Sequence, residues 1–362
     1  MKKRVLHIID HLWLWWAQTI VKWIFEGNNN SNYFLYALRK TDIITHIDHK
    51  NIFISWLSLK YSFPLLQLRK FIKENNIKIL HCHLAKSQII WWVLKILFFP
   101  NIKLVFHEHW QMLREGKIYP NFINFFRNQV DKYIAISKLI KKSIQEKTKI
   151  KEEKISIIYN FVDLNRFKIS DISQRNIFLE KYWIKNTDFL IWFAGRLIEI
   201  KWWELYFYFA IKLLKNHKDF KFIICWIWPD ENELKERIEI SGFKDQFTYL
   251  GYEKNMTQFY NSLHLFVFPS FKEALGLTGL EANASGCPVV ASNIEWLNEI
   301  MIDGKNALLF EKWNIDDWVE KIEKIYKDEW LRKMLISNWL EEVKKYSLDK
   351  YLIDLNKMYE EL

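Results

Sequence analysis

Residues 268–292 hold side chains suited to a phosphorylated, hydroxyl-rich ligand. An apolar run ends at Phe268, and the pattern after it predicts a helix that begins near Gly276. The first N–H groups of a helix lack partners within it and can hold a phosphate. Here they belong to Gly276, Leu277 and Thr278. Glu273 precedes this helix and Glu281 lies on it, so a carboxylate on each side would accept hydrogen bonds from sugar hydroxyls. In the alternative interpretation, Glu273 is a helix-end charge and Glu281 a surface residue.

A pair of basic residues follows another predicted strand, in the sequence FAGRLIEIK at residues 193–201. Gly195 permits a sharp exit from the strand, while Arg196 and Lys201 supply two positive charges. A guanidinium offers a planar fork of donors and an ammonium a point charge, which together match a diphosphate. Basic residues after strands are commonly only solvated. We nevertheless treat this pair as a candidate site, because it is expected to face the helix start at Gly276 across the same edge of the sheet, where the strands end.

Histidines gather at the ends of three strands predicted in the first half of the chain. The groups are His7-Ile-Ile-Asp10-His11, His81-Cys82-His83 and His107-Glu108-His109. Three interpretations stay open: hydrogen bonding to a polar substrate with one histidine near the reacting group, a structural role, or metal binding through the His-x-His spacing. No cysteine or carboxylate cluster completes a tetrahedral ligand set, so we predict no metal site. The sequence also lacks the Gly-x-Ser-x-Gly motif of a serine nucleophile.

These residues need a scaffold in which strands alternate with helices. In the first half we predict strands at residues 4–9, 51–54, 77–81, 103–106, 132–136 and 155–158, with helices at 63–75 and 122–129. In the second half we predict strands at 189–194, 220–225, 247–249, 263–268 and 288–291, and helical structure over 315–362. Such alternation is typical of α/β proteins, whose parallel sheets carry helices on both faces.

The order of these elements predicts two doubly wound, Rossmann-like domains in tandem. We expect an N-terminal domain over residues 1–165, a linker over 166–187 and a C-terminal domain over 188–340. Residues 341–362 are expected to form a terminal helix that can cross back to the first domain. Open α/β sheets bind ligands at the carboxyl ends of their strands. Two such edges would therefore face a central cleft.

Composition and charge exclude several classes of protein. Half of the 362 residues are hydrophobic, so the chain is not disordered, and three scattered cysteines form no disulfide framework. No apolar run reaches the roughly 20 residues of a membrane span, and polar residues interrupt the N-terminal run, which predicts a first strand rather than a signal peptide. Residues 1–170 hold 28 basic and 12 acidic side chains. This excess predicts an anionic partner or, alternatively, a solvated helix face.

Taken together, these motifs make the chain similar to the retaining glycosyltransferases of family 4, which have the GT-B architecture. The strongest match is the pattern PS-x-x-E-x-x-G-l-x-x-x-E-A-x-A-x-G-x-P-V-V-A, which fits residues 269–291. Further matches are a G-R-l-x-x-x-K segment at Gly195, Arg196 and Lys201, N-x-v-D at Asn160 and Asp163, and the pair Glu108 and His109. The matches follow in order from about residue 5 to residue 310.

The resemblance implies a role for each matching residue. Arg196 and Lys201 would bind the donor diphosphate together with the amides at the helix start. Glu281 would bind the nucleotide ribose, Glu273 would contact the donor sugar, and His109 would lie beside the transferred sugar. Catalysis would rest on electrostatic stabilisation of the leaving diphosphate. The resemblance implies no metal or other cofactor, and no enzymatic nucleophile is identified.

Tryptophan stands at many positions where the family has glycine. The chain holds 19 Trp and 9 Gly, whereas a chain of this length should hold roughly 25 Gly. An indole at Trp16 would lie where the backbone must approach the diphosphate, so donor binding would fail. We interpret the pattern as UGA codons translated as Trp although the source organism reads them as Gly. Deliberate substitution and a degenerate homologue are the alternatives. The positions concerned are Trp15, Trp16, Trp202, Trp226, Trp228 and Trp296.

The sequence therefore predicts a cytoplasmic enzyme that moves a sugar, with retention of configuration, from a nucleotide-diphosphate donor to a cell-envelope, polysaccharide or lipid-linked acceptor. The basic first domain would face an anionic acceptor or the inner face of the plasma membrane, and no nucleic acid partner is expected. A nucleotide-sugar epimerase of GT-B type and a catalytically inactive binding or scaffold protein are the alternative functions.

Overall fold

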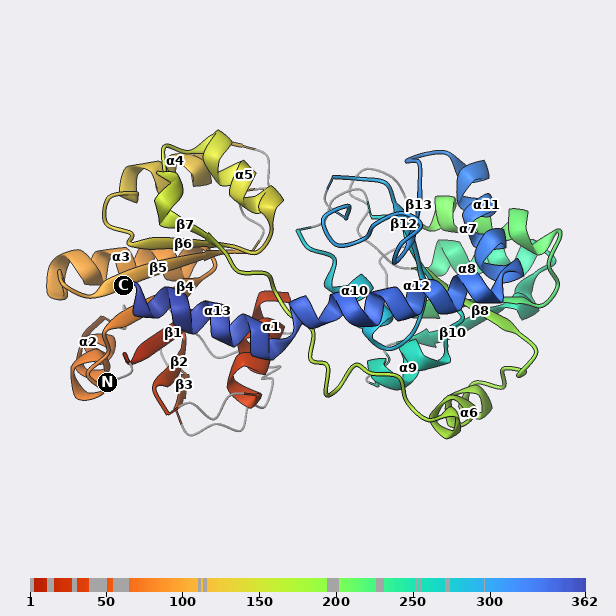
Figure 1. The fold of residues 1–362 in the computed structure, drawn as a ribbon, viewed down its shortest axis with the longest axis horizontal. Helices are drawn as coiled ribbons and strands as arrows, with labels where there is room; N and C mark the ends of the chain where they lie inside the picture. The colour runs from red at the N-terminus through yellow and green to blue at the C-terminus, as the bar shows by residue number, and fades with distance from the viewer. Residues whose placement is uncertain are drawn as a thin grey trace. The chain divides into compact units, whose positions relative to one another are not determined.

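The protein folds into two compact units (Figure 1). The computed structural model describes residues 3–11, 16–27, 31–38, 51–54, 65–109, 112, 116–193, 202–225, 231–251, 253, 255–270, 274–295 and 297–362. Unit 1 consists of Met1–Phe161 and Leu348–Leu362, and unit 2 consists of Val162–Ser347. Residues 166–187, the expected linker, fall within unit 2 and contain a helix. The final helix belongs to unit 1.

Over its described residues, unit 1 contains a seven-stranded parallel sheet with the order β3-β2-β1-β4-β5-β6-β7. Its strands are β1 (Val5–Ile9), β2 (Tyr33–Ala37), β3 (Ile52–Ile54), β4 (Ile79–His83), β5 (Lys103–Glu108), β6 (Lys132–Ala135) and β7 (Ile155–Ile157). Its helices are α1 (Trp16–Glu26), α2 (Leu65–Glu74), α3 (Ala85–Phe98), α4 (Ile118–Phe126), α5 (Lys138–Lys147), the 3₁₀ turn η2 (Glu152–Lys154) and α13 (Leu348–Glu360). Every residue of β1, β2 and β4 is buried, as expected for a sheet covered on both faces.

Unit 2 repeats this plan with a six-stranded parallel sheet, β10-β9-β8-β11-β12-β13, over its described residues. Its strands are β8 (Phe189–Phe193), β9 (Phe220–Cys225), β10 (Phe247–Gly251), β11 (Leu265–Phe268), β12 (Val289–Ser292) and β13 (Leu308–Phe310). Its helices are α6 (Ile172–Lys181), α7 (Trp202–Leu214), α8 (Glu231–Ile240), η3 (Lys244–Gln246), α9 (Met256–Ser262), α10 (Leu277–Ala284), α11 (Ile315–Lys327), α12 (Glu329–Glu342) and η4 (Val343–Tyr346).

The strand orders confirm the predicted fold class, two doubly wound α/β units. Each sheet reverses its strand order once, between β1 and β4 in unit 1 and between β8 and β11 in unit 2. Ligands of open α/β sheets bind at such switch points, beyond the carboxyl ends of the strands. The candidate residues of the sequence lie in or after these strands and, for Glu108 and His109, at the end of the neighbouring strand β5.

Some elements differ from the expectation. Strands β2 and β13 were not predicted, because short, fully buried runs lack the alternation that marks a half-buried strand. Helix α4 begins at Ile118, before the predicted residue 122, since Pro120 stands in its first turn, where proline is tolerated. The predicted helical stretch 315–362 is divided at Asp328, whose carboxylate caps α12 by accepting from Leu331 N at 2.8 Å.

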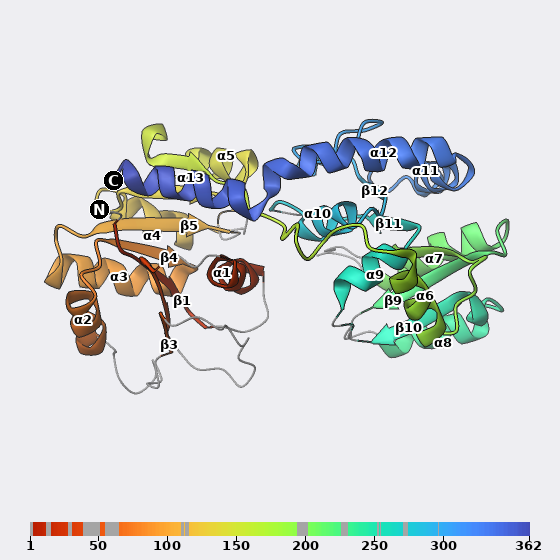
Figure 2. The same ribbon diagram turned by 60° about the horizontal axis from the view of Figure 1, so that its bottom comes forward.

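Helix α13 lies over the sheet of unit 1 (Figures 1 and 2). Its Tyr351 ring packs on Phe161, with ring centroids 4.8 Å apart. The Tyr33 hydroxyl of β2 donates to Asn356 Oδ1 at 2.9 Å. Tyr359, near the end of the helix, is buried against the sheet. The last residues of the chain thus complete the core of the first unit.

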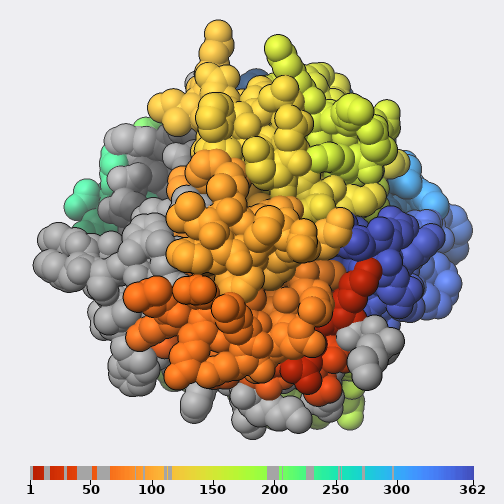
Figure 3. Space-filling model, turned by 90° about the vertical axis from the view of Figure 1, so that its left-hand side faces the viewer, coloured from red at the N-terminus to blue at the C-terminus, as the bar shows by residue number. Residues whose placement is uncertain are grey.

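Helices α3 and α4 expose apolar side chains on one face of unit 1. The ring of Trp92 on α3 lies 3.8 Å from that of Phe126 on α4, so the helices are neighbours. The orange and yellow atoms of this region adjoin on the face seen in Figure 3. The exposed apolar residues are Ile89, Ile96 and Leu97 on α3 and Ile118 and Phe125 on α4. Within the described parts of the chain, no helix combines the length and apolar character needed to cross a membrane.

Candidate functional sites at the strand ends

Helix α10 of unit 2 presents an uncapped N-terminus beyond the end of β11. Gly276 precedes the helix with φ +79°, a left-handed conformation that favours glycine, and as the N-cap residue it offers no side chain that could cap the helix. A Cβ at Gly276 would lie 2.9 Å from Leu297 Cδ2 and 3.0 Å from Phe268 Cε1. The structure thus confirms the predicted helix start. The first N–H groups of a helix, here including those of Leu277 and Thr278, carry a positive electrostatic potential.

Glu281 lies on the same helix and is held by a tyrosine. The Tyr260 hydroxyl of α9 donates to Glu281 Oε2 at 2.9 Å. Burial raises the pKa of Glu281 from 4.5 to about 7, although the Tyr260 bond and the charge of Arg166 act to lower it. The carboxylate is therefore poised between its charged and neutral forms, unlike a freely solvated surface residue.

Sequence reasoning did not find Tyr260 and Arg166. Tyr260 stands 21 residues before Glu281 and shares no motif with it, so only the fold brings the two together. Arg166 follows the N-x-v-D match, in which Asp163 Oδ1 accepts from Arg166 N at 3.3 Å and from Asn165 N at 3.0 Å. That match thus has a local structural role in shaping the turn before Arg166.

Arg196, Lys201 and Glu273 lie outside the described residues, as does the side chain of Trp16. Their places in the chain are still informative. Arg196 and Lys201 stand between the end of β8 and the start of α7, and Glu273 stands between β11 and α10. These connections follow the two strands that flank the switch point of unit 2.

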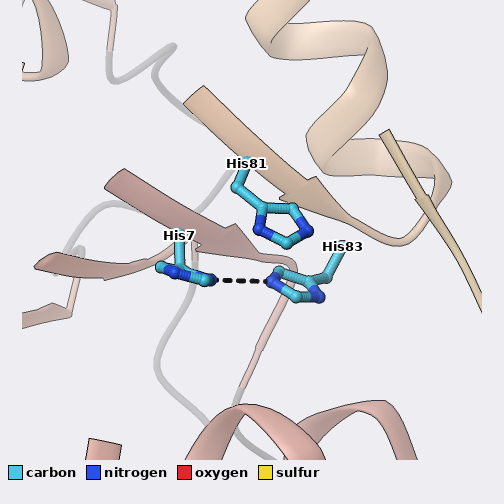
Figure 4. Close-up of side chains that lie close together, drawn as sticks. All are labelled: His7, His81 and His83. Atoms are coloured by element: carbon cyan, nitrogen blue, oxygen red, sulfur yellow. Dashed lines mark hydrogen bonds between the residues drawn. The ribbon is translucent and has the colours of Figure 1, made fainter. Parts of the chain in front are cut away.

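In unit 1, the buried histidines come from β1, β4 and β5, around the other switch point. His7 lies opposite His81 in the sheet, and His83 lies opposite His107. His7 Nδ1 and His83 Nε2 are hydrogen-bonded at 3.1 Å, with His81 beside them (Figure 4). The His7 and His81 ring centroids lie 4.7 Å apart, so the imidazoles pack closely on one face of the sheet.

The remaining contacts join this group to His109 and to α13. His83 Nδ1 and His109 Nε2 are 3.2 Å apart, and His81 Nε2 and His107 Nδ1 are 3.1 Å apart. Tyr359 Oη is hydrogen-bonded to His81 Nδ1 and lies 3.4 Å from His7 Nε2. We call the connected set the imidazole array. Its members, in order of connection, are His107, His81, Tyr359, His7, His83 and His109.

Burial keeps the imidazole array uncharged. It lowers the pKa of His7 and of His109 to about 3. Burial, reinforced by the neighbouring imidazoles, holds the pKa of His81, His83 and His107 well below the ordinary value. Each ring therefore carries one proton at neutral pH and is both a hydrogen-bond donor and an acceptor.

Two overlapping trios in this array have ligand atoms within 4.8 Å of one another, namely His7, His81 and His83, and His83, His107 and His109. Neutral imidazole is a common zinc ligand. In each trio, however, one pair of rings is hydrogen-bonded, His7 with His83 in the first and His83 with His109 in the second. His83 uses both of its nitrogens in this way, so the geometry is that of a hydrogen-bonded array.

A second buried carboxylate lies next to His109. Glu108 Oε1 accepts a hydrogen bond from the Tyr119 hydroxyl and another, at 3.4 Å, from Gln88 Nε2. Burial raises the pKa of Glu108 to about 7, against the lowering effect of these two donors. Asp10, also singled out in the sequence, accepts from Ser87 N at 2.8 Å in the first turn of α3. It is therefore a helix-capping residue.

Two tryptophans have a backbone conformation that suits glycine, and four others bury an unpaired indole N–H group. Of the four described non-glycine residues with positive φ, two are tryptophans, Trp183 at +51° and Trp313 at +69°. Four described tryptophans have buried indole N–H groups without a hydrogen-bond partner, namely Trp91, Trp92, Trp192 and Trp339. By contrast, Trp318 Nε1 donates to Glu311 O at 3.0 Å, as a buried tryptophan should. Trp15, Trp226, Trp228 and Trp296, and the side chain of Trp202, lie outside the described residues.

Two protein-family models match the chain. The one described as Glycosyltransferase Family 4 matches residues 29–166, and the one described as Glycosyl transferases group 1 matches residues 174–341. An uncharacterized glycosyltransferase of Methanocaldococcus jannaschii is 30% identical over 336 residues, which cover 89% of this chain and 86% of that protein. The capsular polysaccharide biosynthesis glycosyltransferase CapM of Staphylococcus aureus is 28% identical over 234 residues, which cover 62% of this chain and 60% of CapM.

Solved structures share the fold over nearly the whole chain. Anabaena HepE in complex with UDP and glucose superposes with a TM-score of 0.83 at 17% identity, covering 99% of this chain and 100% of HepE. A glycosyltransferase from Rickettsia africae superposes with a TM-score of 0.84 at 17% identity, covering 99% of this chain and 98% of the other. The fold is therefore that of the GT-B transferases. With the sequence matches in both halves, the chain belongs to the group 1, family 4 glycosyltransferases.

Proposed function

We propose that the protein transfers a sugar from a nucleotide-diphosphate donor to a glycan or lipid-linked acceptor with retention of configuration. The observation that carries this proposal is the arrangement at the switch point of unit 2. There, the uncapped N-terminus of α10 suits a phosphate, and Glu281, held by Tyr260, suits the ribose hydroxyls. The HepE structures with UDP, with UDP-glucose, and with UDP and glucose support a nucleotide sugar as the ligand class.

Within this proposal, the leaving diphosphate is stabilised by protein charges and amides rather than by a metal ion. Arg196 and Lys201, on the connection after β8, neutralise the diphosphate. Glu273, on the connection before α10, contacts the donor sugar. Preorganised donors of this kind stabilise the charge that develops on the leaving group. The residues that hold the donor thus come from both strands at the switch point.

His109 of unit 1 is proposed to lie beside the transferred sugar. It ends the imidazole array, and burial keeps it neutral, so it can donate or accept a hydrogen bond without changing charge. The acceptor is proposed to be a precursor of a polysaccharide or of the cell envelope. The printed functions of CapM and of LpsB, the lipopolysaccharide core biosynthesis mannosyltransferase of Rhizobium meliloti, support that class.

We further propose that the enzyme works in the cytoplasm, with unit 1 against the inner face of the plasma membrane. The exposed apolar residues of α3 and α4 support this, since Ile118 and Phe125 are 90% and 73% exposed. The excess of basic residues in the first half of the chain adds attraction to anionic lipids. Apolar insertion and charge together give the two contributions that stable peripheral attachment requires.

The active form is proposed to carry glycine at the family-glycine positions. The positive φ of Trp183 and Trp313 supports this, because glycine adopts such a conformation without strain. Reading the gene tests the origin of these residues, with UGA expected at positions such as Trp16 and Trp202. UGG codons there would contradict the recoding.

The function itself is tested by the release of nucleoside diphosphate. The chain as printed is compared with a form carrying Gly at positions 15, 16, 202, 226, 228 and 296, across nucleotide sugars preselected by thermal shift. Release by the glycine form alone is the expected result. Release by neither form would favour a binding or scaffold protein. Conversion of the sugar to its epimer would favour an epimerase.

A further inference from the structure

The imidazole array is one continuous chain of hydrogen bonds that runs from His107 to His109. We call the parts on either side of Tyr359 its two branches. Tyr359, from the far C-terminal end of the chain, joins its two branches. One branch leads through His7 and His83 to His109, and the other leads through His81 to His107. Every ring between the two ends uses one nitrogen toward each neighbour. The protonation pattern of one ring therefore constrains that of the next.

Neutral imidazole has one N–H donor and one acceptor nitrogen. If His7 carries its proton on Nδ1, it donates to His83 Nε2, so His83 must carry its own proton on Nδ1 and donate to His109 Nε2. The same reasoning passes through the Tyr359 hydroxyl, which accepts from one branch and donates to the other. Only two arrangements satisfy every bond and also pair the hydroxyl hydrogen of Tyr359, because a hydroxyl that accepted from both His81 and His7 would leave its own buried O–H group unpaired. All five rings carry the proton on Nδ1, or all five carry it on Nε2.

The buried end of the array distinguishes the two arrangements. His107 Nε2 is buried and has no hydrogen-bond partner among the described residues. In the Nε2 arrangement this atom carries an unpaired buried N–H group. In the Nδ1 arrangement it carries only a lone pair. Unpaired buried N–H groups are the rarer case in proteins, at least for the backbone. The end of the array at His107 thus favours the Nδ1 arrangement.

We propose that Tyr359 is a positioning residue that couples the two branches, so that His109 is held with its Nε2 accepting from His83 and its Nδ1 protonated. Which nitrogen of His109 carries the proton is then set by His107 at the other end of the chain of hydrogen bonds, where Nε2 has no partner among the described residues. The role of His109 toward the sugar rests on the proposed function. In that function, the Nδ1–H group of His109 donates a hydrogen bond to a hydroxyl of the transferred sugar.

The tautomers can be read directly by nitrogen NMR of the intact chain labelled with ¹⁵N-histidine, at pH 7 and without substrate. We expect Nδ1–H at all five buried rings of the wild-type chain. Tyr359→Phe removes the only hydroxyl in the line, so His7, His83 and His109 should then give mixed tautomers. Introduced into the glycine form, the same substitution should lower turnover about fivefold while the KM for the donor changes less than about twofold.

Tyr351→Phe is the matched control. It removes a hydroxyl from the same helix, and this hydroxyl is also buried but has no hydrogen-bond partner. The control should leave all five tautomers and the turnover unchanged. Melting curves of both variants report whether the fold is kept, and the wild-type spectrum tests the proposal without any substitution.

Three results would overturn the proposal. These are Nε2–H or unequal tautomers in the wild-type chain, tautomers unchanged in Tyr359→Phe, and zinc bound at one equivalent, since ligated nitrogens cannot share these protons. Because the spectra need no substrate, they stand apart from the proposed function. Full activity of a His109→Ala variant would contradict the catalytic role of His109 and leave the tautomer result intact.

Discussion

The two units share one folding plan, yet their strand ends carry opposite chemistry. In unit 2, the switch point combines an uncapped helix N-terminus with a partly buried carboxylate held by Tyr260. In unit 1, it holds five neutral imidazoles and the hydroxyl of Tyr359. The first arrangement suits an anion and a ribose, and the second suits uncharged hydroxyl groups. In the proposed function, the first arrangement would bind the charged part of the donor and the second would lie beside the transferred sugar.

The difference follows from the residues that end each strand. After β11, glycine at position 276 allows the left-handed turn that starts a helix. In β4 and β5, alternate positions place histidines on one face of the sheet, where the final helix covers them. In the proposed function, anion binding in unit 2 therefore uses the backbone at the start of α10 together with the side chains of Arg196 and Lys201. The neutral site of unit 1 depends on side chains buried together.

The largest effect is expected from the charges proposed to bind the diphosphate. Arg196→Ala and Lys201→Ala should each reduce turnover by roughly 100- to 1,000-fold, because they remove a preorganised charge from the leaving group. Steady-state kinetics of the glycine form is the measurement. The control is Lys333→Ala, on α12, which loses only a surface pairing with Glu329. Near-normal kinetics of Lys201→Ala would remove this residue from the diphosphate site.

A smaller loss is expected from the end of the imidazole array. His109→Ala should reduce kcat by about 10- to 100-fold with little change in donor affinity, since one hydrogen bond to the sugar is lost. His217→Ala is the control, because its imidazole is bonded to Glu323 in unit 2, away from either switch point. A loss of donor affinity as large as the loss of kcat would assign His109 to the nucleotide site instead.

The buried carboxylates, Glu108 in unit 1 and Glu281 in unit 2, test both units with one measurement. Burial raises each pKa from 4.5 to about 7. Between these values the folded state binds more protons than the unfolded state, so the free energy of unfolding decreases as pH rises from 4.5 to 7. Glu108→Gln and Glu281→Gln remove this penalty. We therefore compare the free energy of unfolding of each variant with that of the wild type. This difference should be more favourable to the variant at pH 8 than at pH 5, by on the order of 1–2 kcal/mol.

Thermal unfolding at the two pH values checks this expectation. Glu180→Gln, at an exposed position of α6, should show no pH-dependent gain. If the gain of either buried variant were the same at pH 5 and pH 8, that carboxylate would not titrate in this window. The result would also show whether the two units balance burial against hydrogen bonding in the same way.

The smallest effect concerns tryptophans in left-handed conformations. Trp183→Gly and Trp313→Gly should raise the free energy of unfolding by about 0.5–1 kcal/mol, since relief of backbone strain outweighs the entropy of glycine. Trp330 is also exposed but lies in helix α12, where glycine is unfavourable. Its replacement by glycine should lower stability. A loss of stability in all three variants would contradict the view that positions 183 and 313 suit glycine.

Much of this architecture was predictable because its determinants are local. Alternating strands and helices gave the fold class, and Gly276 gave the start of α10. Long-range contacts were not predictable in the same way. Nothing in the spacing connects Tyr260 with Glu281, or Tyr359 with His81, since these pairs meet only after the sheets form. The histidines were recognised as polar strand ends, but their union into one array depends on the register of β1, β4 and β5.

The assignment of the nucleotide to unit 2 is tested most directly by the affinity for UDP. It is measured by calorimetric titration of UDP into the glycine form and into two variants of it. Glu281→Ala should weaken binding by about 10- to 100-fold, because it removes a charged partner of the ribose. His109→Ala should leave the affinity within about twofold, as a residue of the neutral site. Unchanged affinity in Glu281→Ala, or equal losses in both variants, would contradict the assignment of the nucleotide to unit 2.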